Sequence, residues 1–134
     1  MPSNVLQLMY NAHILPNFQY CTPIWCNTYP THLLPLFRLQ KKIIRIMSNH
    51  SYLHHTHPLF KNMNILKLVD INKLQIGIYM YKTLNRGNLT ALLPHHNYPT
   101  RTCEHLRVPQ HSLSLFQHSL ALSGPKIWNS LPQS

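Results

Sequence analysis

Acidic residues are almost absent from this chain of 134 residues. It contains 2 Asp and Glu against 12 Lys and Arg, which gives a formal net charge of +10. Polymerases, nucleases and glycosidases bring two or more carboxylates together on a metal ion or a scissile bond. The two acids here, Asp70 and Glu104, lie far apart in the sequence. We therefore expect that the chain by itself is not an enzyme and has no catalytic residues.

Glycine and cysteine are also scarce, with 3 of each. The glycines are too widely spaced for a glycine-rich phosphate loop, and an odd number of cysteines does not form the framework of a secreted disulfide scaffold. There is no basic leader followed by an apolar run, and no apolar run of the roughly 18 residues that a membrane span needs. We expect an intracellular protein, nuclear or cytoplasmic, that is not secreted, has no membrane span and needs no cofactor.

One loose set of metal ligands exists. Cys21, Cys26 and His32 are separated by four and five residues, whereas structural zinc sites usually show two close pairs of ligands. His54, His55 or His57 could supply a fourth ligand. We predict no metal site and two ordinary, half-buried thiols, and the alternative interpretation is a structural zinc ion.

Hydrophobic periodicity predicts a mainly α-helical fold, a small module of three to four helices. Helices are expected at residues 3–15, 31–48 and 71–85, with a short helical turn at residues 57–63. Ser3, Thr31 and Asp70 are the expected N-caps. Pro16 is expected to end the first helix, and the alternative is that the aromatic segment after it continues as helix up to the residue before Pro23. Residues 49–57 are polar and are expected to form a loop.

The last long helix differs from the other two because its apolar residues surround it. An apolar helix of this kind is usually buried. Prolines recur after Pro94, and we expect an extended, Pro-rich C-terminal tail with one strand or short helix near residues 113–122. The expected organisation is therefore a helical region at residues 1–93 followed by an irregular segment at residues 94–134.

Four cations form a stripe on the helix at residues 31–48. Arg38, Lys41, Lys42 and Arg45 fall within about 100° of one another on the helical wheel, and no acid in that helix neutralises them. Such a stripe is typical of contacts with a phosphate backbone. A solvated helix face, a partner protein or an anionic membrane surface are the alternatives. Arg101 lies in a second polar, aromatic run that suits a nucleic-acid contact or a tail packed on the helices.

Seven blocks, in order along the chain, resemble the C-terminal region of jockey-like non-LTR retrotransposon reverse transcriptases. The blocks are Tyr20-Cys21 with Trp25-x-Asn27-Thr28; Leu36-x-x-Leu39-Gln40-Lys41-Lys42 with Arg45-Ile46; Ser51-Tyr52 with His55-Thr56-x-Pro58-Leu59-Phe60; Asn64-Ile65-Leu66-Lys67-Leu68; Met80-Tyr81-Lys82; His96-Asn97-Tyr98-x-Thr100-Arg101; and Gly124-Pro125-Lys126-Ile127-Trp128-Asn129-Ser130-Leu131-Pro132.

The resemblance implies a thumb-like helical region and the segment that follows it in an RNA-directed DNA polymerase. The aromatic-Ala-Asp-Asp motif of the polymerase palm is absent, so no catalytic residue carries over. The implied function is at most sequence-independent binding to the backbone of RNA, DNA or a hybrid duplex, through Arg38, Lys41, Lys42, Arg45 and Arg101. The missing palm is then a packing partner. The alternatives are a stand-alone basic interaction or membrane-surface module, and a non-functional remnant of a dead element.

Overall fold

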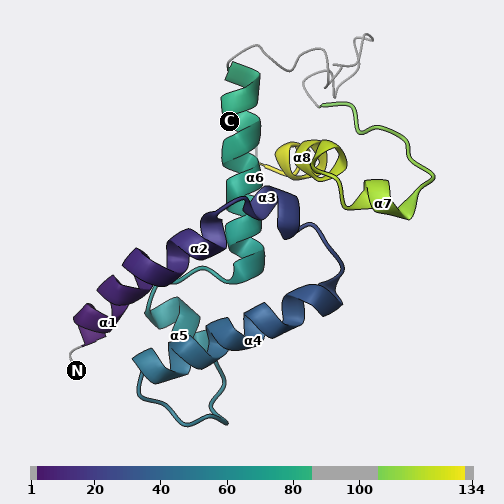
Figure 1. The fold of residues 1–134 in the computed structure, drawn as a ribbon. Coiled ribbons are helices and arrows are strands. Elements are labelled where there is room, and N and C mark those ends of the chain that lie inside the picture. The colour runs from purple at the N-terminus through teal and green to yellow at the C-terminus, as the bar shows by residue number, and fades with distance from the viewer. Residues whose placement is uncertain (1–2, 86–105, 132–134) are drawn as a thin grey trace. The chain divides into compact units, whose positions relative to one another are not determined.

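The computed structural model describes residues 3–85 and 106–131, and its regular structure is almost wholly helical (Figure 1). The elements are α1 (Ser3–Met9), the π-helix η1 (Tyr10–Ile14), α2 (Leu15–Gln19), α3 (Thr22–Trp25), α4 (Pro30–Met47), α5 (His57–Asn62), α6 (Leu68–Asn85), α7 (Ser114–Gln117) and α8 (Leu120–Asn129). This confirms the mainly helical fold that the sequence predicts.

The chain divides into two compact units. The first, unit 1, comprises Met1–Thr22 and Thr28–Asn72, and the second, unit 2, comprises Pro23–Asn27 and Lys73–Ser134. The boundary expected between residues 93 and 94 lies outside the described residues.

Pro16 does not end the first helix, contrary to the prediction. The helix continues through η1 into α2, where Pro16 occupies the first turn. An ordinary α-helix would break here, because the proline ring crowds the carbonyl four residues earlier. The N–H of Leu15 instead donates to the carbonyl of Tyr10, five residues back. This wider π turn accommodates the proline and lets the helix continue.

The predicted helix at residues 31–48 is confirmed as α4, but its expected cap is wrong. Tyr29 is the N-cap, without a side-chain hydrogen bond. Pro30 follows it in the first helical turn, a position that suits proline because no N–H is needed there. The helix therefore begins before Thr31.

Two asparagines end α4 and α5 in the same way. Asn49 and Asn64 have φ angles of 53° and 52°. After α4, the N–H of Asn49 donates to Ile46 and that of His50 donates to Arg45, at 3.2 and 3.0 Å. The amides after α5 repeat this pattern. Both ends are Schellman motifs, which satisfy the last helical carbonyls and reverse the chain.

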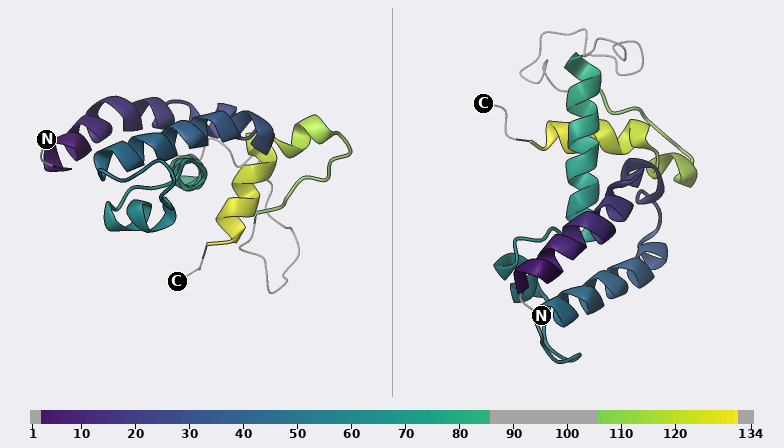
Figure 2. Two further views of the ribbon diagram at one scale, coloured as in Figure 1. Left: turned by 90° about the horizontal axis from the view of Figure 1, so that it is seen from below. Right: turned by 60° about the vertical axis from the view of Figure 1, so that its left-hand side comes forward.

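Unit 1 is built around a core from α4, α5 and η1. The buried residues of this core are Tyr10, Ile44, Met47, Leu59, Phe60 and Ile65. Figure 2 shows α1 lying along α4 in both views. The Gln7 amide donates to the carbonyl of Met63 at 3.1 Å, which ties α1 to the end of α5.

A fully buried amide, that of Gln40, links three segments of unit 1. Its Nε2 donates to the Tyr10 hydroxyl at 3.1 Å and to the Leu66 carbonyl at 2.9 Å. Its Oε1 accepts from the N–H of Leu68 at 3.0 Å. Since Leu68 is the first residue of α6, Gln40 satisfies one of the backbone donors that a helix start leaves unpaired.

This contact explains why the predicted N-cap of α6 is wrong. Helix α6 begins at Leu68, and Asp70 lies inside its first turn, where a carboxylate suits the helix dipole. The expectation that α6 is buried all round is also wrong in part. Leu68, Ile71, Ile76 and Met80 are buried, but Leu74 and Tyr81 are 46% and 60% exposed.

Unit 2 has its own core, and its chain is more helical than the expected tail. Helix α8 lies at residues where an irregular segment was expected. Ile76, Met80 and Leu106 are buried together, with Ile127 and Trp128 packed on them. The side chain of Asn129 donates to the Leu106 carbonyl at 2.8 Å and accepts from its N–H at 2.9 Å.

We predict that Gln40→Leu strongly destabilises the protein. The change leaves the N–H of Leu68 and the carbonyl of Leu66 without their partner, at a cost of about 2 to 4 kcal/mol in the free energy of unfolding. Urea denaturation measures this difference. Lys42→Leu, at an exposed position of the same helix, is the control and should change stability by less than about 0.5 kcal/mol. Equal losses in the two variants would contradict the linking role of Gln40.

We predict that stability falls at alkaline pH because of Tyr10. Burial raises the pKa of the Tyr10 phenol above its ordinary value of 10.0, and the hydrogen bond from Gln40 lowers it by less. Because the pKa is higher in the folded state, the contribution of the neutral phenol to the free energy of unfolding is complete below the pKa of the unfolded state. It declines as pH rises above that value. Urea midpoints at pH 8 to 10.5 should therefore fall less steeply for Tyr10→Phe than for the parent protein. Identical slopes would show that folding does not change the pKa of this phenol.

Candidate nucleic-acid interface

Helix α4 has one buried face and one basic face. Gln40, Ile44 and Met47 are buried, and at 100° per residue they leave the opposite face for the four cations. The helix length of 18 residues gives this face enough turns to hold the stripe at i, i+3, i+4 and i+7. The predicted grouping of the cations on one face is confirmed.

All four cations line one groove of about 760 Å³ in unit 1. Its lining residues come from the basic face of α4 on one side and from the connection from α4 to α5 on the other. Figure 1 shows the course of these two segments. We call this the basic groove. The residues lining it are Pro35, Arg38, Leu39, Lys41, Lys42, Arg45, Tyr52, Leu53, His54, His55 and Thr56. Asp70, the one acid among the described residues, is not part of it.

The four cations are held differently. Arg38 and Lys42 are exposed, while Lys41 and Arg45 are partly buried. The Nζ of Lys41 lies 4.3 Å from the centre of the Phe37 ring, and the Arg45 guanidinium lies 5.3 Å from the centre of the Tyr52 ring. These cation–π contacts fix two of the positive charges in place, whereas Arg38 and Lys42 reach into solvent.

Arg45 also holds the second wall of the groove. Its Nε donates to the carbonyl of His54 at 3.0 Å, so one of its five donors is used within the protein. Within the connection, the N–H of His54 donates to Ser51 at 3.0 Å, and the rings of His50 and His54 lie 4.5 Å apart. The connection is therefore folded back against α4.

The sequence predicts a polar loop here but does not show that the loop forms half of the groove. Tyr52, His54 and His55 belong to the groove although none is among the five predicted nucleic-acid-binding residues. The chain reversal at Asn49 was the available signal, because asparagine tolerates a positive φ after a helix. The direction in which the loop then runs depends on the contact with Arg45.

Cys21, Cys26 and His32, the candidate metal ligands, do not line the basic groove. Arg101 lies outside the described residues. Cys21 is exposed and Cys26 is buried, and burial raises the pKa of the Cys26 thiol. Over residues 3–85 and 106–131, no group of three or more His, Cys, Asp or Glu side chains could hold a metal ion. The alternative of a zinc ion on Cys21, Cys26 and His32 therefore has no structural support among these residues.

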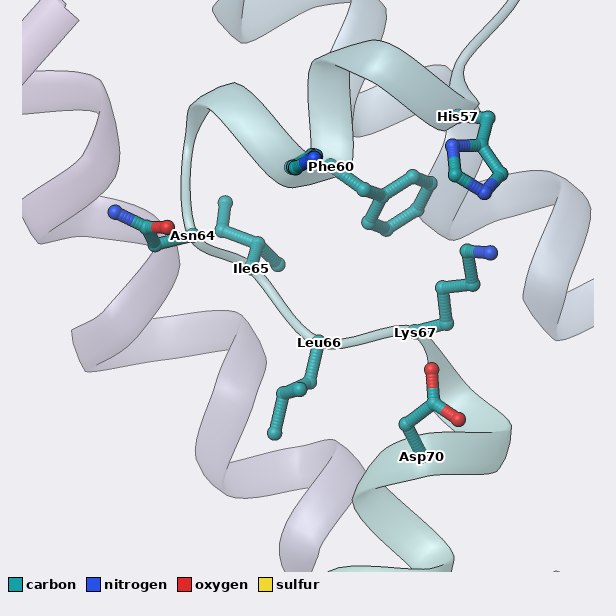
Figure 3. A pocket seen from close by; sticks show the side chains of 8 residues that line it. His57, Phe60, Asn64, Ile65, Leu66, Lys67 and Asp70 are labelled. Carbon is teal, nitrogen blue, oxygen red and sulfur yellow. The ribbon is translucent and has the colours of Figure 1, made fainter.

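A smaller pocket of about 330 Å³ lies in unit 1 beside α5. Figure 3 shows His57, Lys67 and Asp70 among the residues that line it, together with the apolar Phe60 and Ile65. It brings the one described acid close to cations, so opposite charges offset each other. The basic groove concentrates charge of one sign and is the better candidate for a site that binds a polyanion.

Comparison with known proteins identifies no relative. None of the protein-family models, curated proteins or solved structures compared with the chain matches it. In the part of the chain that the structure describes, no helix is both long and apolar enough to cross a membrane.

Proposed function

We propose that the chain binds the phosphate backbone of RNA or DNA through the basic groove, without reading sequence and without catalysis. The observation that carries this proposal is the convergence of Arg38, Lys41, Lys42 and Arg45 on one groove that contains no acid. Cations lined up in this way attract phosphates and release the counterions that condense on nucleic acid. Contacts to phosphates position a protein on its ligand and carry no direct sequence information.

We also infer that the chain derives from the C-terminal region of a non-LTR retrotransposon reverse transcriptase. The seven sequence blocks support this origin. An exposed apolar stripe on α6 is consistent with it: Leu74, Ile78 and Tyr81 lie within about 60° on the helical wheel, and all three are exposed. In a complete polymerase, the palm would be a suitable partner for such a face.

The binding proposal predicts a steep salt dependence that depends on the groove. If all four cations reach phosphates, log affinity should fall with log salt with a slope of about −3, at 0.7 to 0.9 per phosphate. The double variant Lys41→Glu/Lys42→Glu should bind more weakly and show a shallower slope. Fluorescence anisotropy with a labelled RNA–DNA hybrid over a salt series measures both quantities.

A matched pair of double variants separates the effect of the groove on binding from the effect of the net charge. Lys73 and Lys82 are exposed on α6, and Lys73→Glu/Lys82→Glu changes the net charge by the same amount. If both double variants lose affinity equally, the groove is not the binding site. Stronger binding to anionic lipid vesicles than to the hybrid at equal salt would favour a membrane-surface module instead.

The proposed origin predicts the coding sequence upstream of Met1. The same reading frame should continue into an aromatic-Ala-Asp-Asp palm motif, intact or recognisably decayed, because the thumb-like region follows the palm in that family. Sequencing the 5′ end of the transcript together with the adjoining genomic DNA tests this. An upstream region without any trace of the palm would contradict the proposed origin but would leave the binding proposal untouched.

A further inference from the structure

The wall of the basic groove opposite α4 presents an aromatic ring to solvent. Tyr52 is 74% exposed and its neighbour Leu53 is 87% exposed. Aromatic side chains gain free energy when they are buried, so a ring left in water does little for the fold. Tyr52 therefore contributes to the groove rather than to the core of unit 1.

The ring is nevertheless held in a defined place. The Arg45 guanidinium lies over it at 5.3 Å from the ring centre, and the same side chain donates from Nε to the His54 carbonyl at 3.0 Å. The backbone amide of His50 bonds the Arg45 carbonyl at 3.0 Å. Arg45 therefore already holds both ends of this loop. Because of this, a ligand that contacts Tyr52 loses less conformational entropy in ordering the loop.

A positively charged groove with an exposed aromatic ring is the arrangement that binds single-stranded nucleic acid. The cations follow the backbone while bases stack on the ring, and an arginine beside the ring adds cation–π attraction. A duplex keeps its base faces inside the stack, where Tyr52 cannot reach them without base flipping. A single strand offers both the phosphates and the base faces.

We propose that the basic groove binds single-stranded RNA or DNA in preference to duplex, with an unpaired base stacked on Tyr52. This inference rests on the proposed function, since it assigns a class of ligand to the same groove. Arg38, Lys41 and Lys42 supply the attraction to phosphates, and Tyr52 supplies the contact with the base. Because every base has a flat face, this contact needs no particular sequence.

The test compares three labelled ligands at one salt concentration by fluorescence anisotropy. They are an oligothymidylate of 12 nucleotides, an abasic phosphodiester strand of the same length, and a 12-base-pair duplex. The parent protein should bind oligothymidylate about 5- to 100-fold more tightly than the abasic strand, as expected from stacking of a single base. Tyr52→Ala should remove this preference and leave the affinity for the abasic strand unchanged, while Tyr52→Phe should keep the preference.

Tyr81→Ala is the matched control, because Tyr81 is an exposed tyrosine on α6 at 60% exposure. It should keep the preference for oligothymidylate in full. Circular dichroism and a urea titration verify that each variant is folded, which we expect because Tyr52 lies in an exposed loop.

The two proposals fail in distinguishable ways. If Lys41→Glu/Lys42→Glu lowers binding but Tyr52→Ala binds oligothymidylate as the parent does, the stacking inference is wrong and backbone binding stands. If Tyr52→Ala weakens binding to the abasic strand as much as to oligothymidylate, the ring only positions Arg45, and the inference is again wrong. If the lysine variant binds every ligand normally, the proposed function itself fails. If Tyr52→Ala impairs only binding to vesicles of phosphatidylglycerol, the exposed ring serves a membrane surface.

Discussion

The buried amide of Gln40 is the contact on which the rest of unit 1 depends. It bonds the Tyr10 hydroxyl, the Leu66 carbonyl and the N–H of Leu68, so one side chain connects η1, α4 and the start of α6. A buried polar group of this kind is costly unless all its bonds form, and they form together only in one rotational setting of α4. That setting turns the basic face outward. The location of the groove is therefore a consequence of the core.

The sequence blocks that resemble a reverse transcriptase include many residues that maintain the scaffold. A Cβ on Gly124 would lie 2.7 Å from the Met80 sulfur, so a larger residue would displace that side chain. Asn129 bonds both backbone groups of Leu106. Gln40 belongs to the same block as Lys41 and Lys42. Any chain with this fold would need such residues, whatever it binds. A ligand site therefore has to be sought among residues that the scaffold does not use, such as Lys42.

The local sequence pattern predicted those features of the fold that depend on residues close together in the chain. The 3.6-residue period located α4 and separated its basic face from its buried face, and the short helix after Thr56 is present as α5. Two failures, at Pro16 and Thr31, are local, and the others involve partners that are distant in sequence. Asp70 is a good cap by type, but Gln40 already satisfies the amide of Leu68, so α6 begins earlier. Likewise, half of the groove depends on the hydrogen bond from Arg45 to His54, which spacing cannot show.

Repulsion among the cations of the basic groove destabilises the folded state, and a bound anion would reduce this repulsion. Like charges one turn apart on a helix repel by a few tenths of a kcal/mol per pair, and no acid in the groove offsets the four cations. Helix α4 tolerates this repulsion because its opposite face is held by Gln40, Ile44 and Met47, all buried. A polyanion that binds only the folded form neutralises the stripe and adds its own binding free energy to stability. If the groove binds a strand as we propose, binding and folding of unit 1 are linked, and the bound strand stabilises the scaffold that creates the charged face.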